Sequence, residues 1–302
     1  MSSERTPRAY GAQGMVGRLR KVAVRRPDEA MAHADPQVWH YTSAIDIAAA
    51  QAAHDAFTDL LRQAGAEVIY HDQPLPQHAD AVFVFDPALV TDAGAIILRM
   101  GKALRRGEED ALESFFQRQG IPILGRLTGE AHAEGGDTLW LDHDTLAVGV
   151  GFRTNYAAVE QLRAILAPVG VRVLSFELPY FTGPEACLHL LSLISPVDVD
   201  LAVAYPPLMP TPFWQELQER GMRLLPVPEE EFVRWQGTNV LAVAPREVIM
   251  LERNPVTKLL LEEAGCRVAT FPGDALSFKA EGGPTCLTRP LLRDEPERPA
   301  TR

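Results

Sequence analysis

A repeated order of predicted elements constrains the fold of this 302-residue chain more than any other feature of its sequence. Two paired strands, an amphipathic helix and a further strand follow one another twice, with apolar residues at three- and four-residue spacing in the helices. The two copies consist of strands 138–141 and 145–150, helix 156–167 and strand 171–176, and of strands 238–244 and 247–251, helix 254–264 and strand 267–270. A recurring unit of this kind predicts a closed, propeller-like α/β fold. Alternation of helices and strands is equally compatible with an open, doubly wound sheet.

The stretch from Ile45 to Leu124, before these copies, is compatible with a third unit. A helix with apolar residues at helical spacing is predicted from Ile45 to Gly65, where the glycine ends it. The other elements predicted before residue 138 are strands 21–24, 67–70, 81–85, 95–98 and 122–124 and a helix over 108–119. The chain contains no GxGxxG or Walker sequence, so no motif supports a nucleotide-binding sheet.

The bulk composition is that of a globular protein with polar ends. Hydrophobic residues make up 46% and charged residues 23%, which is enough apolar material for a sizeable core. Residues 1–15 and 293–302 are polar and are predicted to be disordered tails. The formal net charge of −11 argues against a nucleic-acid partner and against a polybasic membrane contact.

Cysteine usage and the distribution of apolar residues predict a cytoplasmic protein. The three cysteines are widely spaced and form no CxxC pair, which argues against a disulfide framework or a structural zinc site. The N-terminal residues contain no apolar run and predict no signal peptide. No stretch approaches the roughly 20 apolar residues of a membrane span. We therefore expect a reducing compartment and no membrane partner.

Cys286 is the residue that most strongly suggests chemistry. It follows a Gly-Gly-Pro-Thr run, in which glycine and proline allow a sharp turn that holds the thiol at a bend. A thiol with a pKa of about 8.5 becomes a nucleophile when a neighbouring base or charge activates it. His189 and Glu134 are the partners that the sequence offers. Each also has a structural interpretation, because His189 lies among leucines and Glu134 precedes two glycines, as turn residues often do.

Two further stretches carry paired charges. Asp80 and Asp86 stand at either end of an apolar segment, where carboxylates are well placed to receive a cationic ligand. Arg105 and Arg106 lie in a glycine-flanked stretch, and planar guanidinium groups suit the recognition of a carboxylate. A solvated loop with ordinary ion pairs is the alternative interpretation.

Six collinear stretches together resemble the guanidine-modifying superfamily, whose fold is the five-bladed, pseudo-symmetric α/β propeller called the pentein, built of repeated ββαβ units. The sequence is most similar to bacterial dimethylarginine dimethylaminohydrolases, with arginine deiminases and amidinotransferases as relatives. The stretches are Phe83-Val-Phe-Asp-Pro-Ala-Leu-Val-Thr, Arg105-Arg-Gly-Glu, Glu134-Gly-Gly-Asp, Arg153-Thr-Asn, Leu188-His-Leu and Gly283-Pro-Thr-Cys-Leu. The resemblance implies a single pentein catalytic domain over 16–292, between the two tails.

The resemblance also implies a role for each of seven residues. Cys286 matches the nucleophile that attacks the guanidinium carbon, and His189 matches the general acid and base. Glu134 and Asp86 match two carboxylates that hold the guanidinium from opposite sides. Three further residues match positions that bind the amino and carboxylate ends of an arginine-like substrate. They are Asp80, Arg105 and Arg153.

The implied reaction converts an Nω-methylated arginine into citrulline and a methylamine through a covalent intermediate on the thiol. It needs no metal or organic cofactor, and the implied partner is a small guanidino amino acid. The sequence is compatible with a homodimer but does not fix the oligomeric state. The polar stretch from Arg25 to Tyr41 matches the position of an active-site lid.

Two positions depart from the family patterns. Phe85 precedes Asp86 where many relatives carry an acid, which leaves the preferred degree of methylation open. Leu191 stands two residues after His189, where arginine deiminases carry an acid, and this favours the dimethylarginine type. The alternatives are an amidinotransferase, a deiminase-like enzyme of the same superfamily, and a non-catalytic arginine-binding module.

Overall fold

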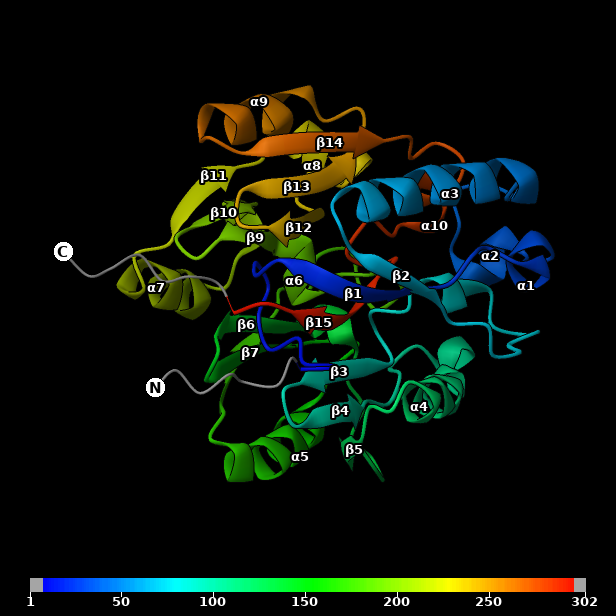
Figure 1. Cartoon of the computed structure of the whole chain (residues 1–302). Helices are drawn as coiled ribbons and strands as arrows, with labels where there is room; N and C mark the ends of the chain where they lie inside the picture. Colours follow the sequence, from blue (N-terminus) through cyan, green and yellow to red (C-terminus); the bar gives the residue numbers. More distant parts are fainter. Residues whose placement is uncertain (1–7, 296–302) are drawn as a thin grey trace.

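Five three-stranded sheets make up the computed structural model, which describes residues 8–295 (Figure 1). The sheets are β15 (Arg289–Arg293), β1 (Leu19–Val24) and β2 (Glu67–Tyr70); β3 (Ala88–Thr91), β4 (Gly94–Ile97) and β5 (Ile123–Arg126); β6 (Thr138–Asp142), β7 (Thr145–Val150) and β8 (Arg172–Glu177); β9 (Ile194–Asp198), β10 (Leu201–Ala204) and β11 (Arg223–Pro226); and β12 (Val240–Ala244), β13 (Glu247–Leu251) and β14 (Arg267–Phe271). The late strand β15 pairs with the early strand β1, so both ends of the described chain share one sheet.

Every sheet has the same pairing pattern. Its first two strands are antiparallel, and its third strand runs parallel to the middle one. A parallel pair requires a crossover connection, and here a helix supplies it each time. The crossover helices are α3 (Ile47–Gln63), α4 (Glu108–Arg118), α5 (Tyr156–Leu166), α7 (Thr211–Glu219) and α9 (Pro255–Glu263). The five ββαβ units confirm the predicted five-bladed α/β propeller over the open sheet.

The crossover helices lie at the periphery of the molecule (Figure 1). Two of them begin at residues that the sequence marks as caps. Asp46 accepts a hydrogen bond from the backbone N–H of Ala49 at the start of α3, and Asn155 accepts one from Ala158 at the start of α5. Each helix buries one apolar stripe against its sheet, as Phe57 and Leu61 of α3 do. The crossover helices therefore pack around the outside of the sheets. A functional site is then built from the shorter helices and the loops.

Shorter helices occupy the connections. They are α1 (Glu29–Ala32), α2 (Pro36–Trp39), α6 (Leu190–Leu193), α8 (Glu229–Trp235), α10 (Ser277–Ala280) and the 3-10 turns η1 (Ala79–Val82), η2 (Ala103–Arg105), η3 (Gly135–Asp137), η4 (Ala167–Val169) and η5 (Pro206–Leu208). The fourth sheet, with strands β9, β10 and β11, lies in a region for which the sequence analysis assigned no elements. Its strands are short, and proline interrupts the apolar pattern at Pro196 and Pro226.

The strand predicted over 81–85 is wrong. Residues 79–82 form the 3-10 turn η1, and the first strand of that sheet begins at Ala88, just after Pro87. The segment is apolar because it is buried on all sides, from Ala79 to Phe85, and not because it alternates between two faces of a sheet.

The folded part of the chain extends further toward both termini than the predicted tails allow. Residues 1–7 and 296–302 lie outside the described residues, so this part of each predicted tail has no structural account here. Gly11 donates its N–H to the carbonyl of Leu291 and accepts from the N–H of Arg293, both at 2.8 Å, and Ala12 is buried. The structure therefore pairs Gly11 of the predicted N-terminal tail with β15, whose last residue, Arg293, is the first residue of the predicted C-terminal tail. Within residues 8–295, no helix combines the length and the apolar character that crossing a membrane would require.

Candidate active site

One pocket collects six of the seven residues for which the sequence suggests a role. The six are Asp80, Asp86, Arg105, Arg153, His189 and Cys286. Trp39 from α2, Lys102 and Cys187 contribute to the same walls. The seventh residue, Glu134, is fully buried and contacts both His189 and Arg153. Residues that are more than 200 positions apart in the sequence thus lie around one small space, whose volume is about 40 Å³.

The glycine pair after Glu134 allows the chain to approach its neighbours closely. A Cβ atom at Gly135 would lie 2.2 Å from the carbonyl oxygen of Phe85, and one at Gly136 would lie 2.2 Å from Nδ1 of His189. Only glycine fits at either position. The Glu-Gly-Gly run therefore brings a carboxylate against His189 as well as opening the 3-10 turn η3.

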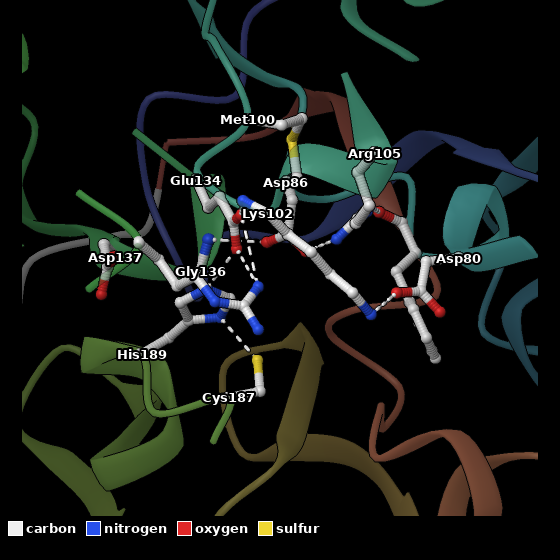
Figure 2. Close-up of polar contacts among 12 residues, drawn as sticks. Asp80, Asp86, Met100, Lys102, Arg105, Glu134, Gly136, Asp137, Cys187 and His189 are labelled. Atoms are coloured by element: carbon white, nitrogen blue, oxygen red, sulfur yellow. Dashed lines mark hydrogen bonds and ion pairs between the residues drawn. The ribbon is translucent and has the colours of Figure 1, made fainter. Parts of the chain in front are cut away.

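His189 forms an ion pair with Glu134. Its Nε2 lies 2.8 Å from Oε2 of Glu134, and its Nδ1 lies 3.7 Å from the sulfur of Cys187 (Figure 2). Burial lowers the pKa of His189, but its interactions with Cys187, the charge of Asp137 and the hydrogen bond with Glu134 outweigh burial and raise it well above its ordinary value. The same contact, together with Arg153, holds the pKa of the buried Glu134 carboxyl well below its usual range. We infer an imidazolium–carboxylate pair in the resting pocket.

Asp137 positions the segment that carries His189. Its carboxylate accepts from the backbone N–H of Leu190 at 3.0 Å and from the hydroxyl of Thr154 at 2.6 Å. Burial raises the pKa of Asp137 to about 6. Asp137 closes the Glu-Gly-Gly-Asp stretch, so the motif supplies both the partner of His189 and the anchor of its backbone.

Asp86 and Arg105 form a second buried pair. Arg105 Nη1 donates to Oδ2 of Asp86 at 2.6 Å, and Oδ1 of Asp86 accepts from the backbone N–H of Gly136 at 3.0 Å (Figure 2). The other donors of Arg105 reach Glu108 and the carbonyl of Phe83. The Arg105 side chain is only 3% exposed. The guanidinium of Arg105 is thus surrounded by the protein's own acceptors, and its binding to a substrate carboxylate stays a prediction.

Asp80 also has an internal partner, which the sequence analysis missed. The ammonium group of Lys102 lies 2.6 Å from Oδ2 of Asp80 (Figure 2). It also lies 3.0 Å from the carbonyl oxygen of Trp39 and over the Trp39 ring. The hydroxyl of Tyr41 donates to Oδ1 of Asp80 at 2.8 Å. Burial, followed by the charge of Asp80, raises the pKa of Tyr41, so it remains a donor. Nothing in the sequence distinguished Lys102 from the surface lysines.

Cys286 lies at a bend that the preceding glycines make possible. A Cβ atom at Gly282 would lie 2.0 Å from the ring of Phe83, and one at Gly283 would lie 2.5 Å from the Asn239 side chain. Asn239 Nδ2 donates to the sulfur of Cys286 at 3.3 Å, and its Oδ1 accepts from the N–H of Thr285 at 3.1 Å. Asn239 is a second residue that the sequence analysis missed, since it falls inside the strand predicted over 238–244.

The resting thiol of Cys286 is protonated at neutral pH. Burial, followed by the negative charge of Asp86, raises its pKa to about 11, although the hydrogen bond from Asn239 acts in the opposite direction. A cation that enters the pocket between these groups would lower this pKa. The electrostatics therefore suit a nucleophile that is activated when a positively charged ligand binds.

Three side chains bring together atoms that could bind a metal ion. Asp86, Glu134 and His189 each present one such atom, all within 4.8 Å of one another. Arg105 and Arg153 already neutralise the two carboxylates, at 2.6 and 3.0 Å. This arrangement suits a planar cation with several N–H donors at least as well as a metal ion, because two internal guanidinium groups already donate to the same acids.

Comparisons with known proteins find relatives that are described as enzymes of arginine and its derivatives. The family model described as arginine deiminase matches residues 72–222 and 209–293. An arginine deiminase of Listeria welshimeri is 31% identical over 262 residues, which cover 73% of this chain and 63% of the relative. A dimethylarginine dimethylaminohydrolase of Streptomyces coelicolor is 31% identical over 271 residues, which cover 89% of this chain and 96% of the relative. The chain thus spans less than two thirds of the Listeria deiminase.

Solved structures match over almost the whole chain. A dimethylarginine dimethylaminohydrolase of Pseudomonas aeruginosa is 25% identical, with a TM-score of 0.76, and the match covers 92% of this chain and all of that one. An amidinotransferase of Microseira wollei has a TM-score of 0.78 at 16% identity, with 94% and 97% covered, and shows the fold alone. The five repeated units, the grouped motif residues and these matches agree, and the chain therefore belongs to the arginine deiminase family, within the guanidine-modifying pentein superfamily.

Proposed function

We propose that this chain is a hydrolase that uses Cys286 to cleave a guanidinium C–N bond of an arginine derivative. The observation that carries the proposal is the single pocket in which Cys286, His189 and Asp86 meet, with Glu134 directly behind His189. The Pseudomonas aeruginosa structure was obtained with citrulline, the ureido amino acid that hydrolysis of arginine derivatives yields. A non-catalytic binding module would need the acids but would not need the thiol.

Binding of the substrate requires the pocket to enlarge. Ligand pockets typically have volumes of about 300–1,000 Å³, and this one has about 40 Å³. The substrate guanidinium replaces the donors of Arg105 and Arg153 at Asp86 and Glu134, and the two carboxylates fix its plane. Trp39, at the end of α2 in the predicted lid segment, forms part of the wall that moves.

The reaction proceeds in two steps. The bound cation lowers the pKa of Cys286, the thiol releases its proton to solvent, and the resulting thiolate adds to the guanidinium carbon to give a tetrahedral adduct. His189 gives its proton to the departing amine as the C–N bond breaks, which leaves an S-alkyl thiouronium on Cys286. His189 then takes a proton from water, the water oxygen adds to the same carbon, and the C–S bond breaks to release the ureido product. Asp86 and Glu134 stabilise the positive charge throughout.

Nω-methylated arginine is the substrate that we propose first. Leu191, at the position where the sequence analysis expects an acid in arginine deiminases, supports it. The Streptomyces coelicolor dimethylaminohydrolase also supports it, because the match covers 96% of that relative. Unmodified arginine is the second candidate, since the family model and several relatives at 31–32% identity are described as arginine deiminases.

The cellular compartment that we propose for the enzyme is based on its thiols. Cys187, Cys266 and Cys286 are all free, which supports the reducing cytoplasm that the sequence predicted. The substrate is a small molecule, and a homodimer is the assembly that we propose to test by light scattering.

A substrate panel tests the proposal. Asymmetric dimethylarginine, monomethylarginine and arginine are incubated with the protein, and citrulline and the released amine are measured. We expect turnover of all three, with the highest kcat/KM for a methylated arginine. Turnover of arginine alone would assign the deiminase activity. A new guanidino product in the presence of glycine or ornithine would mean transfer to an amine, and no turnover together with calorimetric binding of arginine would support a binding module.

Lys102 is predicted to bind the substrate carboxylate in place of Arg105. Its ammonium group lines the pocket and is held by Asp80 and the Trp39 carbonyl. Lys102→Met should lower kcat/KM for amino-acid substrates about 30-fold or more. It should change turnover of agmatine, which has no carboxylate, by less than about threefold. Lys258→Met, which removes a partly exposed lysine of α9 outside the pocket, is the matched control. Equal losses on both types of substrate would contradict this role.

A further inference from the structure

A second cavity lies on the axis of the propeller. Its walls come from β15, β3, β6, β9 and β12, which are the first strands of the five sheets. Because every sheet contributes its first strand, the cavity lies where the five blades meet. Its volume is about 20 Å³, which is room for about one particle of the size of a water molecule.

Two positively charged arginine side chains line this cavity. Arg289 and Arg293 of β15 both line the cavity and are 3% and 4% exposed. The guanidinium of Arg289 donates to the carbonyl of Phe85 at 2.7 Å and lies 3.7 Å above the Phe85 ring. Arg293 donates to the carbonyls of Gly17 and Ala242, at 2.6 and 2.8 Å. All these acceptors are neutral.

No carboxylate balances the two charges within residues 8–295. None of the residues that line the cavity is an aspartate or a glutamate, and neither arginine takes part in an ion pair there. Asp86 is the acid whose charge raises the pKa of Arg289, but Arg105 and Gly136 already occupy its two oxygens. Burial lowers the pKa of both guanidinium groups to about 9, so both remain charged at neutral pH.

Three buried N–H donors at the cavity also lack acceptors. They are Nε of Arg289, Nε of Arg293 and Nε1 of Trp140, for which the described part of the chain provides no hydrogen-bond partner. All three side chains line the same cavity. A buried donor without a partner is unfavourable, and a buried charge without a counter-charge is more so. Two cations, three free N–H donors and space for one particle together suit a small anion that accepts hydrogen bonds.

We propose that this axial cavity binds a small monovalent anion of halide type, held by Arg289, Arg293 and Trp140. A chloride ion accepts hydrogen bonds from N–H groups of all three residues and neutralises one of the two buried charges. A water molecule of similar size satisfies the donors as well, but it leaves both charges unbalanced. The ion is a structural ligand that stabilises the closed ring of blades.

The cavity is separated from the active-site pocket by Phe85. The carbonyl of Phe85 accepts from Arg289, and its N–H donates to the carbonyl of Cys286 at 3.3 Å. An anion that fixes Arg289 therefore also fixes the backbone beside Cys286 and Asp86. This site takes no part in the proposed hydrolysis, so its test is independent of that activity.

Halide substitution tests the site in the full-length chain. Crystals grown in sodium bromide should show a bromine anomalous peak in the cavity, within hydrogen-bond distance of Nε of Arg289 and Arg293. In solution, chloride should raise the melting temperature saturably by about 2 °C or more over gluconate at equal ionic strength. The absence of an anomalous peak, with the same melting temperature in both salts, would mean that water occupies the cavity and would overturn the proposal.

A pair of variants assigns the effect to the cavity. Arg293→Met removes one of the two cations and should abolish the rise in melting temperature with chloride. Arg118→Met removes an exposed arginine near the end of α4 that pairs with Asp72, and it should keep the rise. If Arg293→Met keeps the chloride effect, the proposal is wrong. If that variant does not fold, the bromide peak in the native protein decides.

Discussion

Replacing Cys286 with alanine is expected to reduce turnover of every guanidino substrate by a factor on the order of 10⁴ or more. The sulfur forms the covalent intermediate, and Asp86 and Glu134 do not take over that role, because both carboxylates are engaged in ion pairs. Initial rates of citrulline release measure the loss. Calorimetric binding of the substrate to the variant should persist, since both carboxylates remain.

The other two cysteines provide the controls for this prediction. Cys266→Ala changes a buried thiol in a separate hydrophobic cluster and should retain native rates. Cys187→Ala removes the sulfur next to Nδ1 of His189 and should keep measurable turnover. Loss of all activity in Cys187→Ala, with activity retained in Cys286→Ala, would exchange the roles of the two thiols and refute the assignment.

The reactivity of the thiol provides an independent measurement of the same assignment. Because burial and Asp86 raise the pKa of Cys286 to about 11, the thiolate fraction in the free protein should increase throughout the neutral and mildly alkaline range. Alkylation by iodoacetamide, mapped to Cys286 by mass spectrometry, should accelerate steadily from pH 7 to 10. A rate that levels off near pH 7 would show a thiolate that is already formed without a ligand.

The periodic pattern of predicted elements left both a propeller and an open sheet possible, and the resemblance of six collinear stretches was what favoured the propeller. Repeated ββαβ units leave a periodic pattern, and the glycines next to Glu134 and before Cys286 mark close approaches that no other residue permits. Short polar motifs of this kind are local in the sequence, so they can be recognised without knowledge of their partners.

Pairings between distant residues could not be predicted from the sequence. Lys102 is 22 residues from Asp80, and no periodicity connects them. Asn239 reaches the Cys286 sulfur from the loop before β12, 47 residues away. The uncompensated charges of Arg289 and Arg293 are likewise visible only once their burial is known, since an arginine-rich strand near the C-terminus reads as solvent-exposed.

The most informative variant for these pairings is Arg105→Met, which is expected to destabilise the protein by about 3–5 kcal/mol. Arg105 is the ion-pair partner of both Asp86 and Glu108, and all three side chains are buried. Removing the cation leaves two buried carboxylates without a counter-charge. Urea unfolding measures the loss, and Arg106→Met, at the exposed neighbouring arginine, is the matched control.

The pH dependence of this loss separates the two possible roles of Arg105. Burial raises the pKa of Glu108 to about 7 even beside Arg105, so folding binds a proton and stability falls as pH rises from about 4.5 through 7. Without Arg105 this pKa rises further, and the destabilisation should be larger at pH 8 than at pH 5.5. If Arg105→Met instead unfolds like the control at both pH values and only raises KM for substrates with a carboxylate, Arg105 binds the substrate, as the resemblance implied, and the buried pair is secondary.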